Sequence, residues 1–248
     1  MQAQPIVVTV LLMGGILTAA VGTAPPAEMT YTADFSLMPK QPLPSDGGFI
    51  ANGSNPFFSL KPGHFLRLEG EDDGLPVAVE ITVLKKIRPI LFEMDGDMTL
   101  AVTRVVEERE WIDGQLSQVS LNYFARSAGS DDIYYFGEDV THYEAGQIVD
   151  QEGSWLAGED GALPGLFMPG LFLLGSRYQQ ENSPGVSMDR AEHLDMGLTI
   201  ETAGGVFEDC VVVLETTPLE PDEETIKIYA PGVGLIVDDG LELVEYHP

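Results

Sequence analysis

The chain of 248 residues has a single cysteine, Cys210, so no disulfide can form within it. Cys210 begins an apolar run that continues through Val211–Leu214, which is typical of a small buried side chain. A nucleophilic thiol needs a nearby basic group that lowers its pKa, whereas Glu208 and Asp209 precede this one. The sequence therefore predicts neither a disulfide framework nor a cysteine nucleophile.

Basic residues are also scarce, since 12 Lys and Arg stand against 40 Asp and Glu, giving a formal net charge of −28. Such a balance excludes nucleic acid, whose phosphates require Lys and Arg, and it excludes adhesion to anionic lipid headgroups. The hydrophobic fraction of 44% excludes a disordered acidic chain. Three interpretations stay open: solubility in salt, binding of cations, and a basic protein partner.

Local motifs of common enzymes are missing. The sequence contains no GxSxG, no P-loop and no HExxH, and no HxH brings two histidines together. The histidines are His64, His142, His193 and His247. We therefore expect a protein that is not an enzyme, and we name no catalytic residue.

One long apolar run stands near the beginning, at Ile6 to Val21, and it carries no charge. Small residues and Pro25-Pro26 follow it, a pattern that resembles a secretory signal peptide spanning residues 1–24. A single-pass anchor is the alternative, because the run is close to the shortest that spans a bilayer and no Lys or Arg precedes it. We expect export to the periplasm or outside the cell, with no membrane span after cleavage.

Residues 25–54 are polar and rich in proline, which predicts a linker or an arm that lies over the domain. We expect residues 55–248 to form a single all-β domain. A sustained helical period is missing throughout, and only Asp189 to Met196 is compatible with one short helical turn.

Alternating apolar residues between acid-and-glycine turns predict consecutive β-hairpins. The segments Val77–Val83 and Thr225–Tyr229 alternate, and the clearest hairpin runs from Leu100 to Arg126 with a turn at Asp113-Gly114. Many antiparallel strands in one chain must curl or pack face to face. The predicted fold is an antiparallel meander that forms an open or closed barrel or a wide curved sheet, with a sandwich as the alternative.

The segment Ala162 to Leu174 is too apolar for an ordinary surface loop, so we expect it to act as a lid or plug at the mouth of the sheet. An apolar ligand would lie against it and the neighbouring aromatic side chains. The alternative is that these aromatic residues only fill the β core. The predicted ligand-binding residues are Tyr135, Trp155, Phe167 and Met168.

Paired acidic residues suggest a second kind of site, because calcium prefers six to eight oxygen ligands. No EF-hand pattern is present, and acids beside glycine are also common in solvated turns. The predicted metal ligands are Asp131, Asp132, Glu138 and Asp139. Calcium is the one cofactor that we expect under this alternative.

Glu108 and Glu110 share one face of a predicted strand and suggest an acidic hydrolase as a third hypothesis. Such an enzyme needs two carboxyl groups with separated pKa values in one cleft. We interpret this pair instead as part of a solvated strand face, which is normally polar.

A series of short motifs runs through the chain in a defined order. They are YFGEDV (135–140), GSW (153–155), MPG (168–170), TPLEP (217–221) and APGVGL (230–235). In combination they resemble a family of exported bacterial β-rich proteins without an established activity. APGVGL alone is similar to periplasmic lipoprotein carriers with an open barrel. The resemblance implies export and a β fold, and it supplies no catalytic residue.

Together these observations predict an exported, non-enzymatic β protein that binds an apolar or amphipathic ligand near a barrel mouth. A calcium-dependent structural or interaction module and an acidic hydrolase are the alternatives. The expected partners are a small apolar ligand or a basic protein.

Overall fold

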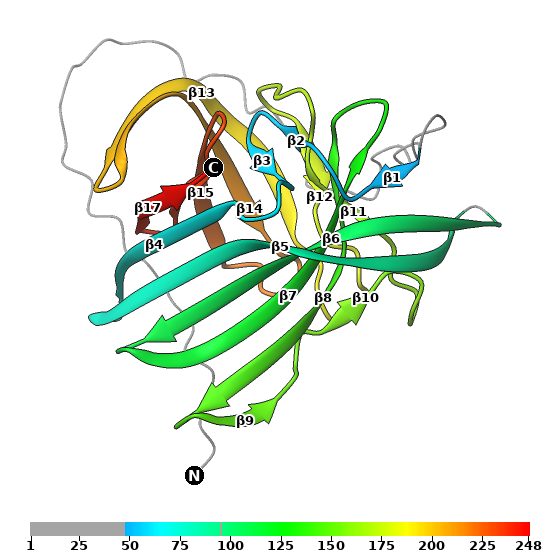
Figure 1. Cartoon of the computed structure of the whole chain (residues 1–248), viewed down its shortest axis with the longest axis horizontal. Helices are drawn as coiled ribbons and strands as arrows, with labels where there is room; N and C mark the ends of the chain where they lie inside the picture. Colours follow the sequence, from blue (N-terminus) through cyan, green and yellow to red (C-terminus); the bar gives the residue numbers. More distant parts are fainter. Residues whose placement is uncertain (1–47, 95) are drawn as a thin grey trace, which may run out of the picture.

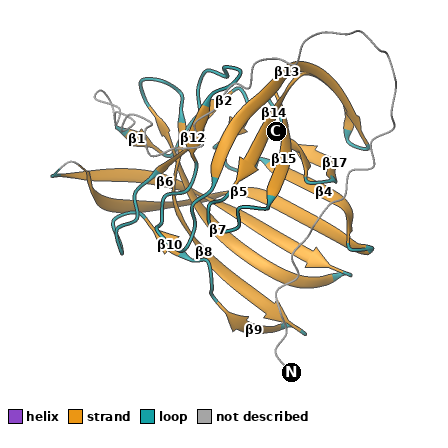
Figure 2. Cartoon of the chain, turned by 180° about the vertical axis from the view of Figure 1, so that it is seen from behind, coloured by secondary structure: helices purple, strands orange, loops and turns teal. Residues whose placement is uncertain are grey.

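The computed structural model of the chain describes residues 48–94 and 96–248. The predicted signal peptide and residues 25–47 of the predicted linker lie outside the described residues. Figure 2 shows strands and loops only, so the all-β prediction is confirmed for the described part. The helical turn that Asp189 to Met196 suggested is wrong, because Arg190–Thr202 form a strand. No membrane-spanning helix is found in the part of the chain that the structure describes.

Seventeen strands make up the described chain. They are β1 (Phe49–Ile50), β2 (Ser54–Asn55), β3 (Phe58–Ser59), β4 (Phe65–Asp72), β5 (Leu75–Met94), β6 (Asp97–Ile112), β7 (Gln115–Ser127), β8 (Ile133–Glu144), β9 (Gln147–Asp150), β10 (Trp155–Leu156), β11 (Gly165–Met168), β12 (Arg177–Gln179), β13 (Arg190–Thr202), β14 (Gly205–Thr216), β15 (Glu224–Ala230), β16 (Gly234–Asp238) and β17 (Leu241–His247).

Fifteen of the strands belong to one strongly curved sheet (Figure 1). Its order is β10-β8-β7-β1-β6-β5-β4-β17-β16-β15-β14-β13-β12, with β9 and β11 also paired to β8. The path has two free ends, so the sheet is open rather than a closed barrel. The wide curved sheet among the predicted forms is therefore the one observed.

Two meanders build this sheet, one from β4 to β8 and the other from β13 to β17. Antiparallel pairing of β17 with β4 joins them, so the end of the domain lies beside its first long strand. Hairpin turns of type I′ require positive φ at both central residues, which suits an acid or small residue followed by glycine. Such pairs, with φ between 45° and 49° at the first residue, are Asp73-Gly74, Asp113-Gly114, Ala145-Gly146 and Asp239-Gly240.

Residues 48–54, which we predicted as part of a linker or arm, belong to the folded structure. Phe49 pairs with Ala101 of β6 in parallel and with Ser127 of β7 in antiparallel orientation. Its ring contacts Tyr134 and Phe136 edge-on, with centroids 5.1 and 5.0 Å away. Phe49 and Ala51 are therefore part of the core, and the Phe49 side chain holds this segment between two strands.

A bulge bends β5 where its register against β6 shifts between Val83 and Ile87. Arg104 of β6 is buried at this point, and its guanidinium donates to the carbonyl oxygens of Lys85 and Ala51 at 2.9 and 3.0 Å. Beyond the bend, the β5–β6 hairpin projects away from the rest of the sheet (Figure 1). Ile90, Phe92 and Ala101 lie beyond the bend and are buried, so the base of this hairpin also contributes to the core.

The apolar segment Ala162 to Leu174, which we predicted as a lid or plug, is only partly buried. Its centre forms β11, which pairs with β8, and Met168 is fully buried. Phe172 stacks on the His193 ring with centroids 3.6 Å apart. The exposed part carries Leu171 at 69%, Leu173 at 55% and Leu174 at 55% exposure.

Candidate functional site

A cavity of about 160 Å³ lies on the concave side of the curved sheet. Strands from both meanders line it, and β3 and β11 contribute one aromatic residue each. The lining side chains are Phe58, Ser59, His64, Leu66, Ile81, Val83, Val106, Glu108, Asn122, Phe124, Tyr135, Phe167, Glu181, Lys227, Tyr229, Leu235 and Asp238, with Gly234 between them. Aromatic, aliphatic and ionisable groups therefore meet in one enclosed space.

Four aromatic rings form the apolar wall of the cavity. Phe124 stacks on Tyr135 with centroids 4.5 Å apart, and it contacts Phe58 and Phe167 at 4.9 Å each. These rings come from β7, β8, β3 and β11. Phe124 and Tyr135 are cross-strand partners, and β11 pairs with β8, so strand pairing brings three of the four rings together.

The opposite part of the lining is acidic. Glu108 lies on β6 next to Val106, and both side chains face the cavity because alternate residues of a strand share one face. Burial raises the pKa of Glu108 to about 7; Lys227 lowers it, and the nearby carboxylates of Asp238, Glu110 and Glu215 raise it further. The interpretation of Glu108 as part of a solvated strand face is wrong, since the concave side of β6 is enclosed.

Glu138 carries a second perturbed carboxyl group. It lies on β8 opposite Asn122 of β7. Burial raises its pKa to about 7, and the charge of Glu108 adds to this effect, while the nearby polar groups of Tyr135 and Trp155 oppose it. Glu108 and Glu138 therefore influence each other across the same interior space.

Lys227 of β15 is the one Lys or Arg among the described residues that line the cavity. Its Nζ lies 2.9 Å from Oε2 of Glu215 and 3.7 Å from Oδ1 of Asp238. Burial by itself would lower the pKa of Lys227, but the charges of Asp238 and Glu215 raise it well above its usual value. The single cation is thus already matched by two carboxylates.

Glu181 adds a further carboxyl group beside β11, and Asp189 lies near it. Burial raises the pKa of both groups, and the charge of Asp189 raises that of Glu181 further. The Ser187 hydroxyl donates a hydrogen bond to Glu181. The interior therefore holds more carboxyl groups than one lysine can neutralise.

Three of the four predicted ligand-binding residues come together at the cavity. Tyr135 and Phe167 line it, and the Trp155 ring meets Tyr135 edge-on with centroids 5.4 Å apart. Met168 points into the core and is fully buried. Its backbone carbonyl oxygen accepts a hydrogen bond of 3.1 Å from Nδ2 of Asn55, so its role is structural.

The four predicted metal ligands do not converge. Asp131 pairs with Arg126, and the Asp132 carboxylate accepts from the backbone N–H of Gly170 at 2.7 Å. Glu138 faces the interior, whereas Asp139 lies on the exposed side of β8.

Asp139 bonds Arg88 at 3.0 Å and accepts from the Tyr123 hydroxyl at 2.5 Å. In residues 48–94 and 96–248 no group of three or more His, Cys, Asp or Glu side chains is arranged to hold a metal ion. Calcium binding stays a prediction without support from this geometry.

Sequence reasoning missed most of the polar lining, including Lys227, Tyr229 and Asp238. Lys227 stands between Ile226 and Ile228, and this alternation shows that it faces away from both isoleucines. The pattern does not show which of the two faces is inside. The curvature of the sheet decides which face of β15 is inside, and this is known only from the structure.

No family model, curated protein or solved structure matches the chain. The resemblance to exported bacterial β-rich proteins therefore stays a prediction.

Proposed function

We propose that the chain is an exported, non-enzymatic binding protein whose cavity takes a small amphipathic ligand. The observation that carries this proposal is the cavity itself, which the aromatic wall around Phe124 and the carboxyl group of Glu108 line together. Ligand sites are mostly apolar concave spaces with a few convergent polar groups, many of them with perturbed pKa values. The proposed lid is the segment Ala162 to Leu174, whose residue Phe167 lines the cavity.

The volume limits the size of the ligand. An engineered cavity of about 150 Å³ in another protein binds benzene, and the present cavity of about 160 Å³ is similar in size. A single ring or a short branched chain fits this space, whereas a lipid chain would have to leave most of its length outside. The proposed ligand is therefore small.

A cavity-filling variant tests the proposal. Val106→Phe adds a ring to a lining residue, and we expect it to abolish the saturation-transfer NMR signal of benzyl alcohol that the wild-type protein gives. Val119→Phe is the control, because Val119 lies on β7 with the opposite strand parity to the lining residue Asn122. Circular dichroism would establish that both variants fold. Equal benzyl alcohol signals from wild type and Val106→Phe would contradict binding in this cavity.

Acid-dependent hydrolysis is the second candidate, and the proximity of Glu108 to Glu138 favours it. Both groups, however, have a pKa of about 7, whereas an acid and a base of a hydrolase need separated values. Hydrolysis of 4-nitrophenyl glycosides that is lost in Glu108→Gln and in Glu138→Gln would support this candidate. Equal turnover by wild type and both variants would exclude these residues as its acid and base.

A further inference from the structure

We infer that the ligand is a small organic cation, with its positive group among the carboxyl groups of Glu108, Glu138 and Glu181 and its apolar part against the rings of Phe124 and Tyr135. This inference rests on the proposed binding function and names the chemical class of the ligand. Charge balance and the type of lining carry it.

The interior has an excess of negative groups. Lys227 is paired with Glu215 and Asp238, and although its charge lowers the pKa of Glu108, that pKa still lies at about 7. The imidazole of His64, which also lines the cavity, is bonded through Nε2 to the carbonyl oxygen of Val233 at 2.9 Å. Burial lowers its pKa, so it is neutral at pH 7. A positive charge on a bound ligand would neutralise part of the negative charge of Glu108 and Glu138.

Tyr229 reports on the charge of the cavity. This residue is only 2% exposed and lines the cavity. Burial raises the pKa of its hydroxyl group well above the usual value, and the charges of Glu215, Asp238 and Glu108 raise it further, whereas Lys227 lowers it. The carboxyl groups therefore act together on the same space, even with Lys227 present.

The type of lining favours an organic cation over a metal ion. A metal ion needs several oxygen or nitrogen ligands at short range, and the described residues contain no such arrangement. Aromatic faces attract ammonium and guanidinium groups through the ring quadrupole, most strongly where water is excluded. The stacked rings of Phe124 and Tyr135, 4.5 Å apart, and the edge-on ring of Phe167 supply such surfaces beside the carboxyl groups.

Acidic groups that are buried without enough positive charge lower the stability of the folded protein. Proteins keep such destabilising residues mainly where function requires them. Ionisation of Glu108 and Glu138 is unfavourable in the free protein because both lie in a poorly solvated space. A bound cation would favour their charged forms, so binding would release protons near pH 7. We therefore expect affinity to increase between pH 6 and pH 8.

Several other titratable groups act on these two carboxyl groups and share in that pH dependence. They are Glu110, Asp189, Glu215, Lys227, Asp238, Tyr135 and, through its contact with Val233 at the cavity edge, His64.

Three probes with one ring and different charges test the inference: benzyltrimethylammonium, benzyl alcohol and benzenesulfonate. The ammonium of the first probe does not titrate, so changes with pH report on the protein. By isothermal titration calorimetry in about 0.15 M salt, we expect benzyltrimethylammonium to bind at least about tenfold more tightly than benzyl alcohol. We expect no binding of benzenesulfonate.

Matched variants separate the cavity from the general negative charge of the protein. Glu108→Gln should weaken binding of benzyltrimethylammonium about tenfold and leave benzyl alcohol unchanged. Glu107→Gln removes the same charge one residue away, where the carboxylate pairs with Arg109 at 2.8 Å, and it should leave both affinities unchanged. Glu138→Gln and Asp139→Asn form a second matched pair on β8.

The outcomes distinguish this inference from the proposed function. If benzyl alcohol binds as tightly as benzyltrimethylammonium, the cation inference is overturned and small-ligand binding stands. Equal weakening by Glu107→Gln and Glu108→Gln would also overturn it, because attraction to net charge would then explain the result. Failure of all three probes to bind would overturn both.

Discussion

Glu108 and Glu138 are carboxyl groups that the fold holds in a space with little water. Each has a pKa of about 7 there, above the value near 4.5 of an unperturbed glutamate. The folded state therefore binds these protons more tightly than the unfolded state does. The contribution to stability is fully present below pH 4.5 and is lost as pH rises through 7.

Replacing Glu108 by Gln removes this pH-dependent cost. We expect the Glu108→Gln variant to be about as stable as wild type at pH 4.5, where Glu108 is protonated in the folded protein. At pH 8 the variant should be roughly 2 kcal/mol more stable, because glutamine has no charge to desolvate and water in the cavity screens part of the cost for glutamate. Urea unfolding at both pH values measures the difference. Glu107→Gln serves as the control and should change stability by less than about 0.5 kcal/mol at either pH. A Glu108→Gln variant that is less stable than wild type at pH 8 would contradict the assignment.

Lys227 has the opposite role, because it neutralises two carboxylates in the interior. Lys227→Met would leave Glu215, which is 8% exposed, and Asp238 without their cation. Breaking a buried pair typically costs about 3–5 kcal/mol. By urea unfolding, we expect a loss of about 3 kcal/mol at pH 8. The loss should be smaller at pH 5, because burial raises the pKa of Asp238 and its protonation removes one of the two charges.

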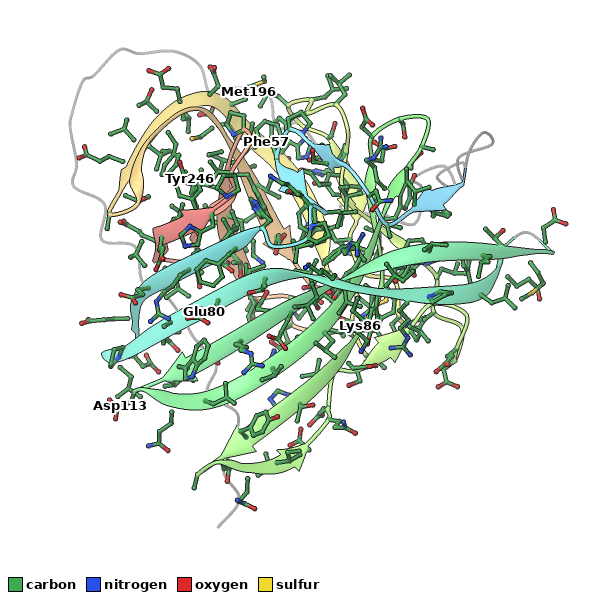
Figure 3. The ribbon with its side chains drawn as sticks, viewed as in Figure 1. Phe57, Glu80, Lys86, Asp113, Met196 and Tyr246 are labelled. Carbon is green, nitrogen blue, oxygen red and sulfur yellow. The ribbon has the colours of Figure 1, made fainter. Side chains whose placement is uncertain are left out.

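Lys86→Met is the control for this variant, because Lys86 is exposed and lies at the bend of β5 (Figure 3). Its stability should stay within about 0.5 kcal/mol of wild type. If both lysine variants lost equal stability, the ion pairs of Lys227 would have no special role.

At the scale of elements, β11 and the residues after it connect the two meanders. β11 pairs with β8 of the first meander, and Gly165 lies so close to β12 that an added Cβ would be 2.0 Å from the carbonyl oxygen of Gln180. Farther along, His193 of β13 donates from Nδ1 to the carbonyl oxygen of Leu173 at 3.0 Å and accepts from the Tyr178 hydroxyl at 2.9 Å. The apolar segment is therefore anchored at both ends and exposes only the leucines between them.

Phe172 tests this anchor. Phe172→Ala removes the ring that stacks on His193 and is only 8% exposed, so we expect a loss of about 3 kcal/mol in unfolding free energy. Leu171→Ala is the control, because Leu171 is 69% exposed and its truncation should change stability by less than about 0.5 kcal/mol. Thermal melts of the two variants provide the measurement. Equal effects would show that the segment is not anchored through Phe172.

At the scale of the whole molecule, the net charge of −28 governs how the protein responds to salt. Like charges repel each other in the compact state, and salt screens that repulsion over about 10 Å at 0.1 M. We expect the melting temperature to rise by several degrees between 0.01 and 0.5 M NaCl. Calcium chloride at equal ionic strength should produce a similar rise, because the described carboxylates form no metal-binding group. A much larger rise with calcium, reversed by EDTA, would instead support the calcium-dependent module.

The sequence by itself determined the β class, the turn positions and the alternation along each strand. The turns at Asp113-Gly114 and Asp239-Gly240 can be predicted from the sequence, because the backbone of a tight hairpin needs positive φ at two adjacent residues. Tyr135 and Phe167, which we predicted as ligand-binding residues, line the cavity, and their binding of a ligand stays a prediction.

Only the tertiary structure decided which face of each strand is inside. Alternation separates Glu107 from Glu108 and Glu138 from Asp139, but it treats the two faces as equivalent. The pairing of β17 with β4 and the curvature that follows enclose one of those faces, and they bring Lys227 of the second meander to Glu108 of the first. Burial and charge balance depend on distances between residues that are far apart in the chain, and for that reason local pattern predicted strands while the fold created the site.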